Sequence, residues 1–373
     1  MRIVAIGASG NAGRAISNLL APGLAAGDEL VLAGRNAGRL DRARSEITTA
    51  AKVSTAVVDA ANTAGIRDLV AGADLVIVTA SRPDLVGSLA REVLDAGADW
   101  FDTLLSSPAK LAALRALEPE ITAAGRCFVT DGGFHPGLPA VLVRWAAEQL
   151  DEVVEGDVMG GMRINWQADT VAESTIEEML EEFTHFDLSA WIDGERRAVR
   201  WAECPTVDFG EPIGRKLTVP MPLAEMDELP KQYPSLRRCG FYICGFGPAM
   251  DYLVLPILMV MGRIRGLRRA AIRLTRWSMV RLASSPPPHR LVIQTEVIGQ
   301  RAGRLATASA KVSGVDGYLL TAAPAVACLR RVLDGDARTP GLHLQAHLVP
   351  PGPFLADLAD LGLEVETSVV TAG

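Results

Sequence analysis

Residues 2–13, RIVAIGASGNAG, decide the fold class of this sequence. Residues 2–6 are mostly apolar and predict a buried strand, and the glycine-rich turn that follows lies at the opening of a predicted helix. A glycine turn in this context lets the backbone bend tightly, approach a pyrophosphate and pack the helix against the strand, while the helix N-terminus supplies N–H groups and a positive dipole. The stretch therefore predicts a dinucleotide-binding turn. Its three glycines are Gly7, Gly10 and Gly13.

Beyond this turn, apolar strand-like runs alternate with helical segments. A helix is expected over residues 11–21 and an arginine-rich one over 37–48. Turn signals such as Ala96-Gly97 and Ala124-Gly125 end the later helical segments. Six βα units of this kind predict an α/β fold, a Rossmann-type doubly wound parallel sheet. The further predicted strands cover residues 29–33, 53–58, 74–79, 99–102 and 126–130.

A chain of 373 residues is long enough for two domains. Residues 1–137 are expected to form the dinucleotide-binding Rossmann domain. A helix over residues 138–150 leads into a β-rich α+β domain, residues 138–316, for substrate binding and dimerisation. Residues 317–373 are expected to return to the first domain. Within the later parts we predict β-rich segments at 152–166, 190–219 and 290–313, helices at 175–186, 319–334 and 353–361, and a strand at 342–348.

Composition excludes several classes of protein. The 37 basic and 44 acidic residues give a net charge of −7, so no overall basic surface for nucleic acid is expected. The five cysteines contain no CxxC pair, which argues against a disulfide framework and a structural zinc site, and we predict no metal site. No signal peptide is recognised, and Asp251 interrupts the longest weakly charged stretch, so no transmembrane helix is expected. These features favour a cytoplasmic protein.

The second predicted strand ends in Leu-Ala-Gly-Arg-Asn, residues 32–36, without the acidic residue that binds the ribose of NAD. Arg35 instead offers a planar guanidinium suited to a 2′-phosphate, which favours NADP(H) over NAD(H). The alternative is a surface arginine paired with Asp41. Asp59, after the third strand, is either an adenine contact or a helix N-cap. The expected cofactor-binding residues are Gly7, Ser9, Gly10, Asn11, Ala12, Gly13, Arg35, Asn36, Asp59, Thr79, Ala80 and Ser81.

The order of these motifs resembles the saccharopine dehydrogenase family. The resemblance is carried by GASGNAG, by LAGRN, by Trp100-Phe101-Asp102-Thr103 and by GGFHPGLP at residues 132–139, and it extends to the C-terminal segment. It is specific over the first 150 residues and loose in the middle of the chain. The resemblance implies NADP-linked chemistry that interconverts a secondary amine and an imine, in a cleft between the two domains.

One position departs from that pattern, because many family members carry an acidic residue where this sequence has His135. The substrate is therefore left open between a small amino-acid-like molecule and a carrier-bound or lipid-like one. Carrier-bound and lipid-like substrates are those of related enzymes such as trans-acting enoyl reductases.

Hydride transfer needs a proton-transfer group besides the cofactor. The candidates follow strands whose carboxyl ends form the ligand edge of a doubly wound sheet. Asp102 and His135 are the predicted catalytic residues, with Asp131 as a weaker candidate. Each has a structural alternative, such as an N-cap for Asp102. In the second domain Arg163, Trp166, Tyr242 and Asp251 interrupt apolar stretches and are further candidates.

Three functions remain open at this stage. The first is an NADPH-dependent oxidoreductase acting at a C–N bond. The second is a reductase of a C=C or C=O bond in a lipid-like, polyketide-like or carrier-bound substrate. The third is a non-catalytic protein that senses NADP, because a fold alone does not guarantee catalysis.

Residues 252–282 join an apolar run to a run of arginines. This combination suits a subunit interface, an acidic carrier protein or a membrane surface. We expect it to contribute to a homodimer interface, and peripheral membrane contact is allowed but not favoured.

Overall fold

The computed structural model describes residues 1–166, 176, 180, 188–247 and 249–372. The chain divides into two compact units. The first comprises Met1–Val141 and Tyr318–Leu363, and the second comprises Leu142–Gly317 and Glu364–Gly373.

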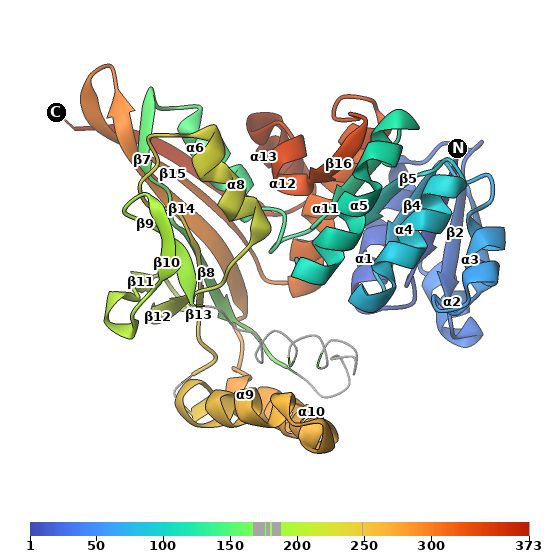
Figure 1. Cartoon of the computed structure of the whole chain (residues 1–373), viewed down its shortest axis with the longest axis horizontal. Coiled ribbons are helices and arrows are strands. Elements are labelled where there is room, and N and C mark those ends of the chain that lie inside the picture. Colours follow the sequence, from blue (N-terminus) through green and yellow to red (C-terminus); the bar gives the residue numbers. More distant parts are fainter. Residues whose placement is uncertain (167–175, 177–179, 181–187, 248, 373) are drawn as a thin grey trace. The chain divides into compact units, whose positions relative to one another are not determined.

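The first unit contains a seven-stranded sheet in the order β16-β6-β5-β4-β1-β2-β3, and every neighbouring pair is parallel (Figure 1). From β3 to β6 this is the doubly wound Rossmann order, which confirms the predicted fold class. The six strands predicted between residues 2 and 130 are present, each within two residues of its expected bounds. The strands are β1 Arg2–Ile6, β2 Glu29–Gly34, β3 Lys52–Val57, β4 Leu75–Val78, β5 Asp99–Asp102, β6 Cys127–Thr130 and β16 Gly341–Leu344.

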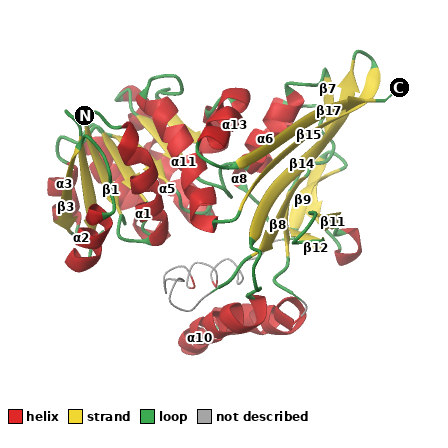
Figure 2. Cartoon of the chain, turned by 180° about the vertical axis from the view of Figure 1, so that it is seen from behind, coloured by secondary structure: helices red, strands yellow, loops and turns green. Residues whose placement is uncertain are grey.

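Helices cover both faces of this sheet (Figures 1 and 2). On one face Ile66, Leu89 and Leu114, from three successive helices, pack against Val4 and Val76 in one buried cluster. Burial on both faces explains why the central strands β1, β2 and β4 are continuous apolar runs rather than alternating ones. The helices are α1 Asn11–Leu20, α2 Ala37–Ser45, α3 Thr63–Val70, α4 Val86–Asp95, α5 Pro108–Ala123, α11 Gly317–Leu333, α12 Gln345–Leu348 and α13 Pro351–Asp360, and α6 Pro139–Ala147 crosses the boundary between the units.

The second unit is built on a mixed sheet in the order β11-β12-β13-β8-β14-β15-β17, with β7 also paired to β14. Only β13 and β8 run parallel. Its α+β character confirms the prediction for the middle of the chain. The elements are β7 Glu152–Glu155, β8 Val158–Arg163, β9 Ser189–Ile192, β10 Glu195–Ala198, β11 Thr206–Asp208, β12 Arg215–Pro220, α8 Ala224–Gln232, β13 Phe241–Cys244, α9 Leu255–Arg263, α10 Arg268–Ser278, β14 Arg290–Arg301, β15 Arg304–Gly314 and β17 Glu364–Thr371.

The C-terminal segment differs from the predicted return to the first domain. Its first part does join the first unit, but β17 pairs with β15 of the second unit along eight residues. The predicted strand 342–348 also ends early, because residues 345–348 form α12. The predicted helix 175–186 lies mostly outside the described residues.

Candidate functional site

The β1–α1 turn has a backbone that only glycine fits. Gly7 has φ +88°, in the left-handed region, and a Cβ there would lie 2.7 Å from the amide nitrogen of Ala80. A Cβ on Gly13 would lie 2.5 Å from the carbonyl oxygen of Gly7 and 2.6 Å from Oγ1 of Thr79. The turn therefore packs against the end of β4 as tightly as the glycine spacing predicts.

The N-terminus of α1 carries no side-chain cap. Gly10 is the N-cap residue, and the first turn contains no acidic residue. The first hydrogen bond of the helix runs from the amide of Arg14 to the carbonyl of Gly10, at 2.9 Å. The amides of the residues between them have no acceptor within the helix. Such a helix end, with its positive dipole, is a site suited to a phosphate.

The expected side chains around this turn differ in what they contact. Asn11 Nδ2 donates to the hydroxyl of Tyr318 at 2.7 Å, within the first unit. The carbonyl of Ser9 accepts from the guanidinium of Arg39 at 3.0 Å. Thr79 Oγ1 donates to the carbonyl of Ile6 at 3.2 Å, which joins the ends of β4 and β1.

Arg35, directly after β2, is exposed, and its side chain makes no ion pair or hydrogen bond with any residue the structure describes. The alternative pairing with Asp41 is therefore not formed. Arg39, four residues later on α2, is also exposed. The end of β2 and the start of α2 thus carry two exposed guanidinium groups, of which only that of Arg35 was predicted from the sequence.

Two other predicted cofactor residues organise local turns. Asn36 caps α2, because its Oδ1 accepts from the amide of Arg39 at 3.0 Å. Asp59 is exposed and its Oδ1 accepts from the amide of Ala61 at 3.0 Å, whereas Asn62 caps α3. The N-cap considered for Asp59 therefore falls on Asn62. Ala80 and Ser81 lie half-buried beyond β4.

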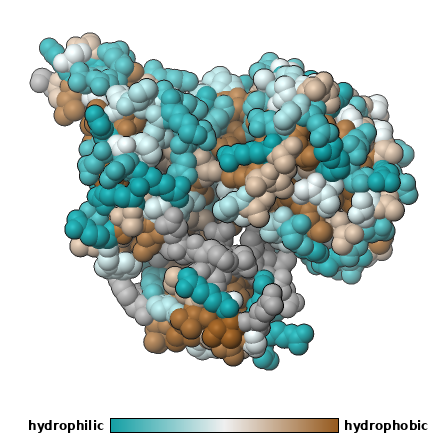
Figure 3. Space-filling view, viewed as in Figure 1, coloured by the Kyte–Doolittle hydropathy of each residue, from teal (hydrophilic) through white to brown (hydrophobic). Residues whose placement is uncertain are grey.

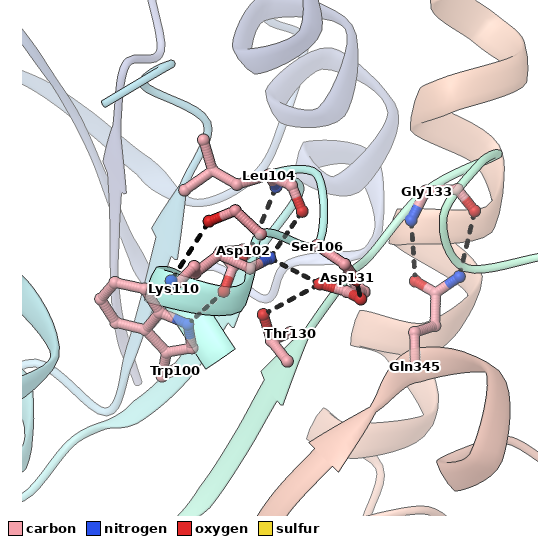
Figure 4. A network of polar contacts seen from close by, with 10 residues as sticks. Trp100, Asp102, Leu104, Ser106, Lys110, Thr130, Asp131, Gly133 and Gln345 are labelled. Atoms are coloured by element: carbon pink, nitrogen blue, oxygen red, sulfur yellow. Dashed lines mark hydrogen bonds and ion pairs between the residues drawn. The ribbon is translucent and has the colours of Figure 1, made fainter. Parts of the chain in front are cut away.

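At the ends of β5 and β6 lies a buried cluster of three charges (Figure 4). Lys110 Nζ lies 3.1 Å from Oδ1 of Asp102 and 2.5 Å from Oδ1 of Asp131, and all three side chains are 0% exposed. Asp102 also accepts from Nε1 of Trp100 at 2.8 Å and from the amide of Leu104 at 3.1 Å. The carboxylate of Asp102 therefore has three donors and no surface open to a substrate.

Burial and pairing shift the ionisation within this cluster. Burial opposes the charged form of Lys110, but the carboxylates of Asp102 and Asp131 outweigh it, so the pKa of Lys110 is raised. Burial raises the pKa of Asp131, because a single lysine only partly offsets it and Asp102 adds a like charge. The ammonium of Lys110 is thus held in its charged form, and Asp131 is harder to ionise than a solvent-exposed aspartate.

His135 lies four residues beyond Asp131 in a turn with two left-handed glycines. Gln345 holds this turn: its Oε1 accepts from the amide of Gly133 at 3.2 Å, and its Nε2 donates to the carbonyls of Gly133 and Gly137 at 3.2 and 3.0 Å. Burial lowers the pKa of His135 to about 4, so the imidazole is neutral at pH 7.

Sequence reasoning missed Lys110 and Gln345. Lysine near a helix start is normally a solvent-exposed residue, and nothing in its spacing indicated burial. Gln345 was placed inside a predicted strand. In the second unit, Tyr242 is wholly buried in an apolar cluster, and Asp251 accepts from the amides of Phe246 and Gly247.

No group of three or more His, Cys, Asp or Glu side chains suited to a metal occurs among the described residues. Within the same residues, no helix is both long and apolar enough to cross a membrane.

Residues 3–129 match the family described as Saccharopine dehydrogenase NADP binding domain. The match confirms the resemblance seen in the glycine turn and the strand that follows it, and it confirms NADP as the cofactor. The residues fit that cofactor, since its phosphates suit the uncapped α1 terminus and Arg35, which has no ion-pair partner within the described part of the chain.

The saccharopine dehydrogenase (L-Glu forming) from Saccharomyces cerevisiae has a similar structure, with a TM-score of 0.68, 15% sequence identity, and coverage of 98% of this chain and 99% of the yeast chain. The DAP dehydrogenase of C. glutamicum aligns with a TM-score of 0.49, 15% identity, and coverage of 96% and 98%. At such identity the yeast likeness shows the fold of both units. No sequence among the curated proteins matches this chain.

Proposed function

We propose that this protein is an NADPH-dependent oxidoreductase that interconverts a secondary amine and an imine. The observation that carries the proposal is the NADP binding domain over residues 3–129, together with the turn geometry at Gly7 and Gly13. When bound, the nicotinamide cofactor supplies or accepts the hydride. The chain must hold that cofactor and manage one proton.

In this proposal the β1–α1 turn and the end of β2 bind the cofactor. The backbone at Gly10 allows close approach of the pyrophosphate, and the α1 N-terminus offers its amides and dipole. Arg35 would bind the 2′-phosphate, since its guanidinium makes no ion pair or hydrogen bond with the residues the structure describes. Arg39 adds a second positive charge four residues later.

We assign proton transfer to His135 rather than Asp102. Oxidation of a secondary amine removes a hydride from carbon and a proton from nitrogen, so the chain needs a base. His135 follows β6 at the carboxyl ends of the strands, where a doubly wound sheet binds its ligands. Its imidazole is neutral at pH 7 and can accept a proton, and its lowered pKa makes it a weaker base than a free imidazole. Asp102 is held by Lys110, Trp100 and Leu104, which suits a positioning role at the end of β5.

The proposal is tested by following NADP⁺ reduction with a panel of N-substituted amino acids that includes saccharopine. We expect turnover with at least one of them, and His135→Asn is expected to lower kcat by about 10²-fold or more, while NADPH affinity stays within a few fold. Tight NADPH binding without turnover on any secondary amine would contradict the C–N assignment. In that case the non-catalytic sensor becomes the better account.

A second candidate is reduction of a C=C or C=O bond in a lipid-like or carrier-bound substrate. The observation that favours it is the exposed apolar surface of α9 in the second unit, which a small zwitterion does not require. NADPH oxidation with enoyl thioesters or long-chain ketones, in the absence of activity on amines, would select this candidate. The homodimer and the cytoplasmic location stay predictions.

A further inference from the structure

Residues 250–283 form a helical hairpin in the second unit. A π-helical turn, Met250–Val254, leads into α9, and α10 ends in a second π-helical turn, Met279–Ala283. One side of the hairpin is buried. Met250, Leu258 and Ala271 are each 0% exposed and belong to one apolar cluster.

The opposite side of α9 is apolar as well, and it is exposed. Leu253 is 63% exposed, Ile257 44%, Val260 62% and Ile264 47%. Ile257 and Val260, three residues apart, lie on one face of α9, while Leu253 lies in the π-helical turn before the helix and Ile264 directly follows it. Figure 3 shows this apolar surface over α9 and α10, with hydrophilic side chains at its margins. Trp277, on α10, is also exposed, at 54%.

The charge of the hairpin is opposite to that of the whole chain. Residues 250–283 contain seven arginines, one aspartate (Asp251) and no glutamate or lysine, a net charge of +6. The chain has a net charge of −7, so the rest of it carries −13. Arg269, Arg273 and Arg281 are exposed and make no ion pair with any residue that the structure describes.

We propose that this hairpin docks on an anionic lipid surface, with the α9 face in the acyl boundary and the arginines among the headgroups. Amphipathic helices bind membranes through this combination of apolar side chains, interfacial tryptophan and cationic flanks. The hairpin would lie on the membrane, because no helix among the described residues is long and apolar enough to cross it.

Charge argues against a second copy as the occupant. A twofold-symmetric dimer places the same patch of both subunits against itself, which would bring the exposed Arg269, Arg273 and Arg281 of both subunits into one interface. Like charges across an interface oppose association. The hairpin therefore suits an anionic surface better than the subunit contact expected from its sequence.

The test is co-sedimentation of the full chain with vesicles of phosphatidylcholine alone or mixed with phosphatidylserine. We expect binding to the mixed vesicles only, with loss of binding at high salt. Arg269→Glu combined with Arg273→Glu, and Ile257→Gln combined with Val260→Gln, should each weaken binding by about tenfold or more.

Matched controls come from β15 of the same unit. Leu305 is 61% exposed, close to the value for Val260, and Arg304 is exposed beside it. Leu305→Gln and Arg304→Glu should leave vesicle binding unchanged. Circular dichroism checks that every variant is folded.

Three results would overturn the proposal. The first is absence of binding to the mixed vesicles. The second is equal loss in the control variants. The third is that the hairpin variants abolish a dimer, or binding to an acidic protein, while vesicle binding persists.

Discussion

Two regions at the ends of strands in the same parallel sheet differ in whether their polar groups have partners within the chain. At the ends of β1 and β2, the α1 terminus has no cap and Arg35 has no ion-pair partner among the described residues. At the ends of β5 and β6, Lys110 and two aspartates are wholly buried and satisfy one another. Under the proposed function the first arrangement is completed by the bound cofactor, whereas the second is complete in itself. Substitutions should therefore affect cofactor affinity in one region and stability in the other.

The largest effect is expected from Lys110→Met. It leaves two buried carboxylates without their cation, which costs about 3–5 kcal/mol of unfolding free energy. Urea denaturation measures the loss. Arg91→Met is the matched control, since Arg91 and Glu120 form a surface pair, 37% and 59% exposed, whose loss should cost about 1 kcal/mol or less. Equal losses in the two variants would show that the buried cluster is not a stabilising network.

Gly13→Ala should act on the cofactor turn. Its Cβ would meet the carbonyl of Gly7 at 2.5 Å and Thr79 Oγ1 at 2.6 Å, so the turn must shift. We expect a loss of about 3 kcal/mol in NADPH affinity, the upper end of overpacking costs. Gly27→Ala is the control, because a Cβ there meets nothing within 4 Å. Unchanged NADPH titrations for Gly13→Ala would place the cofactor elsewhere.

His135 should make stability depend on pH in the acid range. Its folded pKa of about 4 lies below the usual 6.5, so between these values the unfolded chain binds a proton that the folded chain excludes. Stability should fall as the pH is lowered from 6.5 to 4, by about 2 kcal/mol for this partly exposed ring, and His135 should add no slope above 6.5. Unfolding of the wild type and His135→Asn across this range checks it; parallel curves would contradict the assignment.

The sequence predicted the elements of the first unit because each buried strand is a short apolar run bounded by turn residues. It did not predict β17, whose partner β15 lies about 60 residues away along the chain and leaves no local signal. Lys110 resembles any surface lysine until the fold places it between Asp102 and Asp131. The glycine turn was predictable because its constraints are local. The hydrogen bonds from Gln345 to Gly133 and Gly137 were not, because they join residues about 200 positions apart in the chain.

The central claim is that the end of β2 reads the 2′-phosphate of NADPH through Arg35. Calorimetric titration of the wild type and Arg35→Ala with NADPH and NADH tests it directly. We expect the variant to lose about 1.5 kcal/mol of NADPH affinity, the low end for a charge-assisted contact because Arg35 is exposed, and to bind NADH as the wild type does. Equal losses for both cofactors, or no loss for either, would contradict the claim.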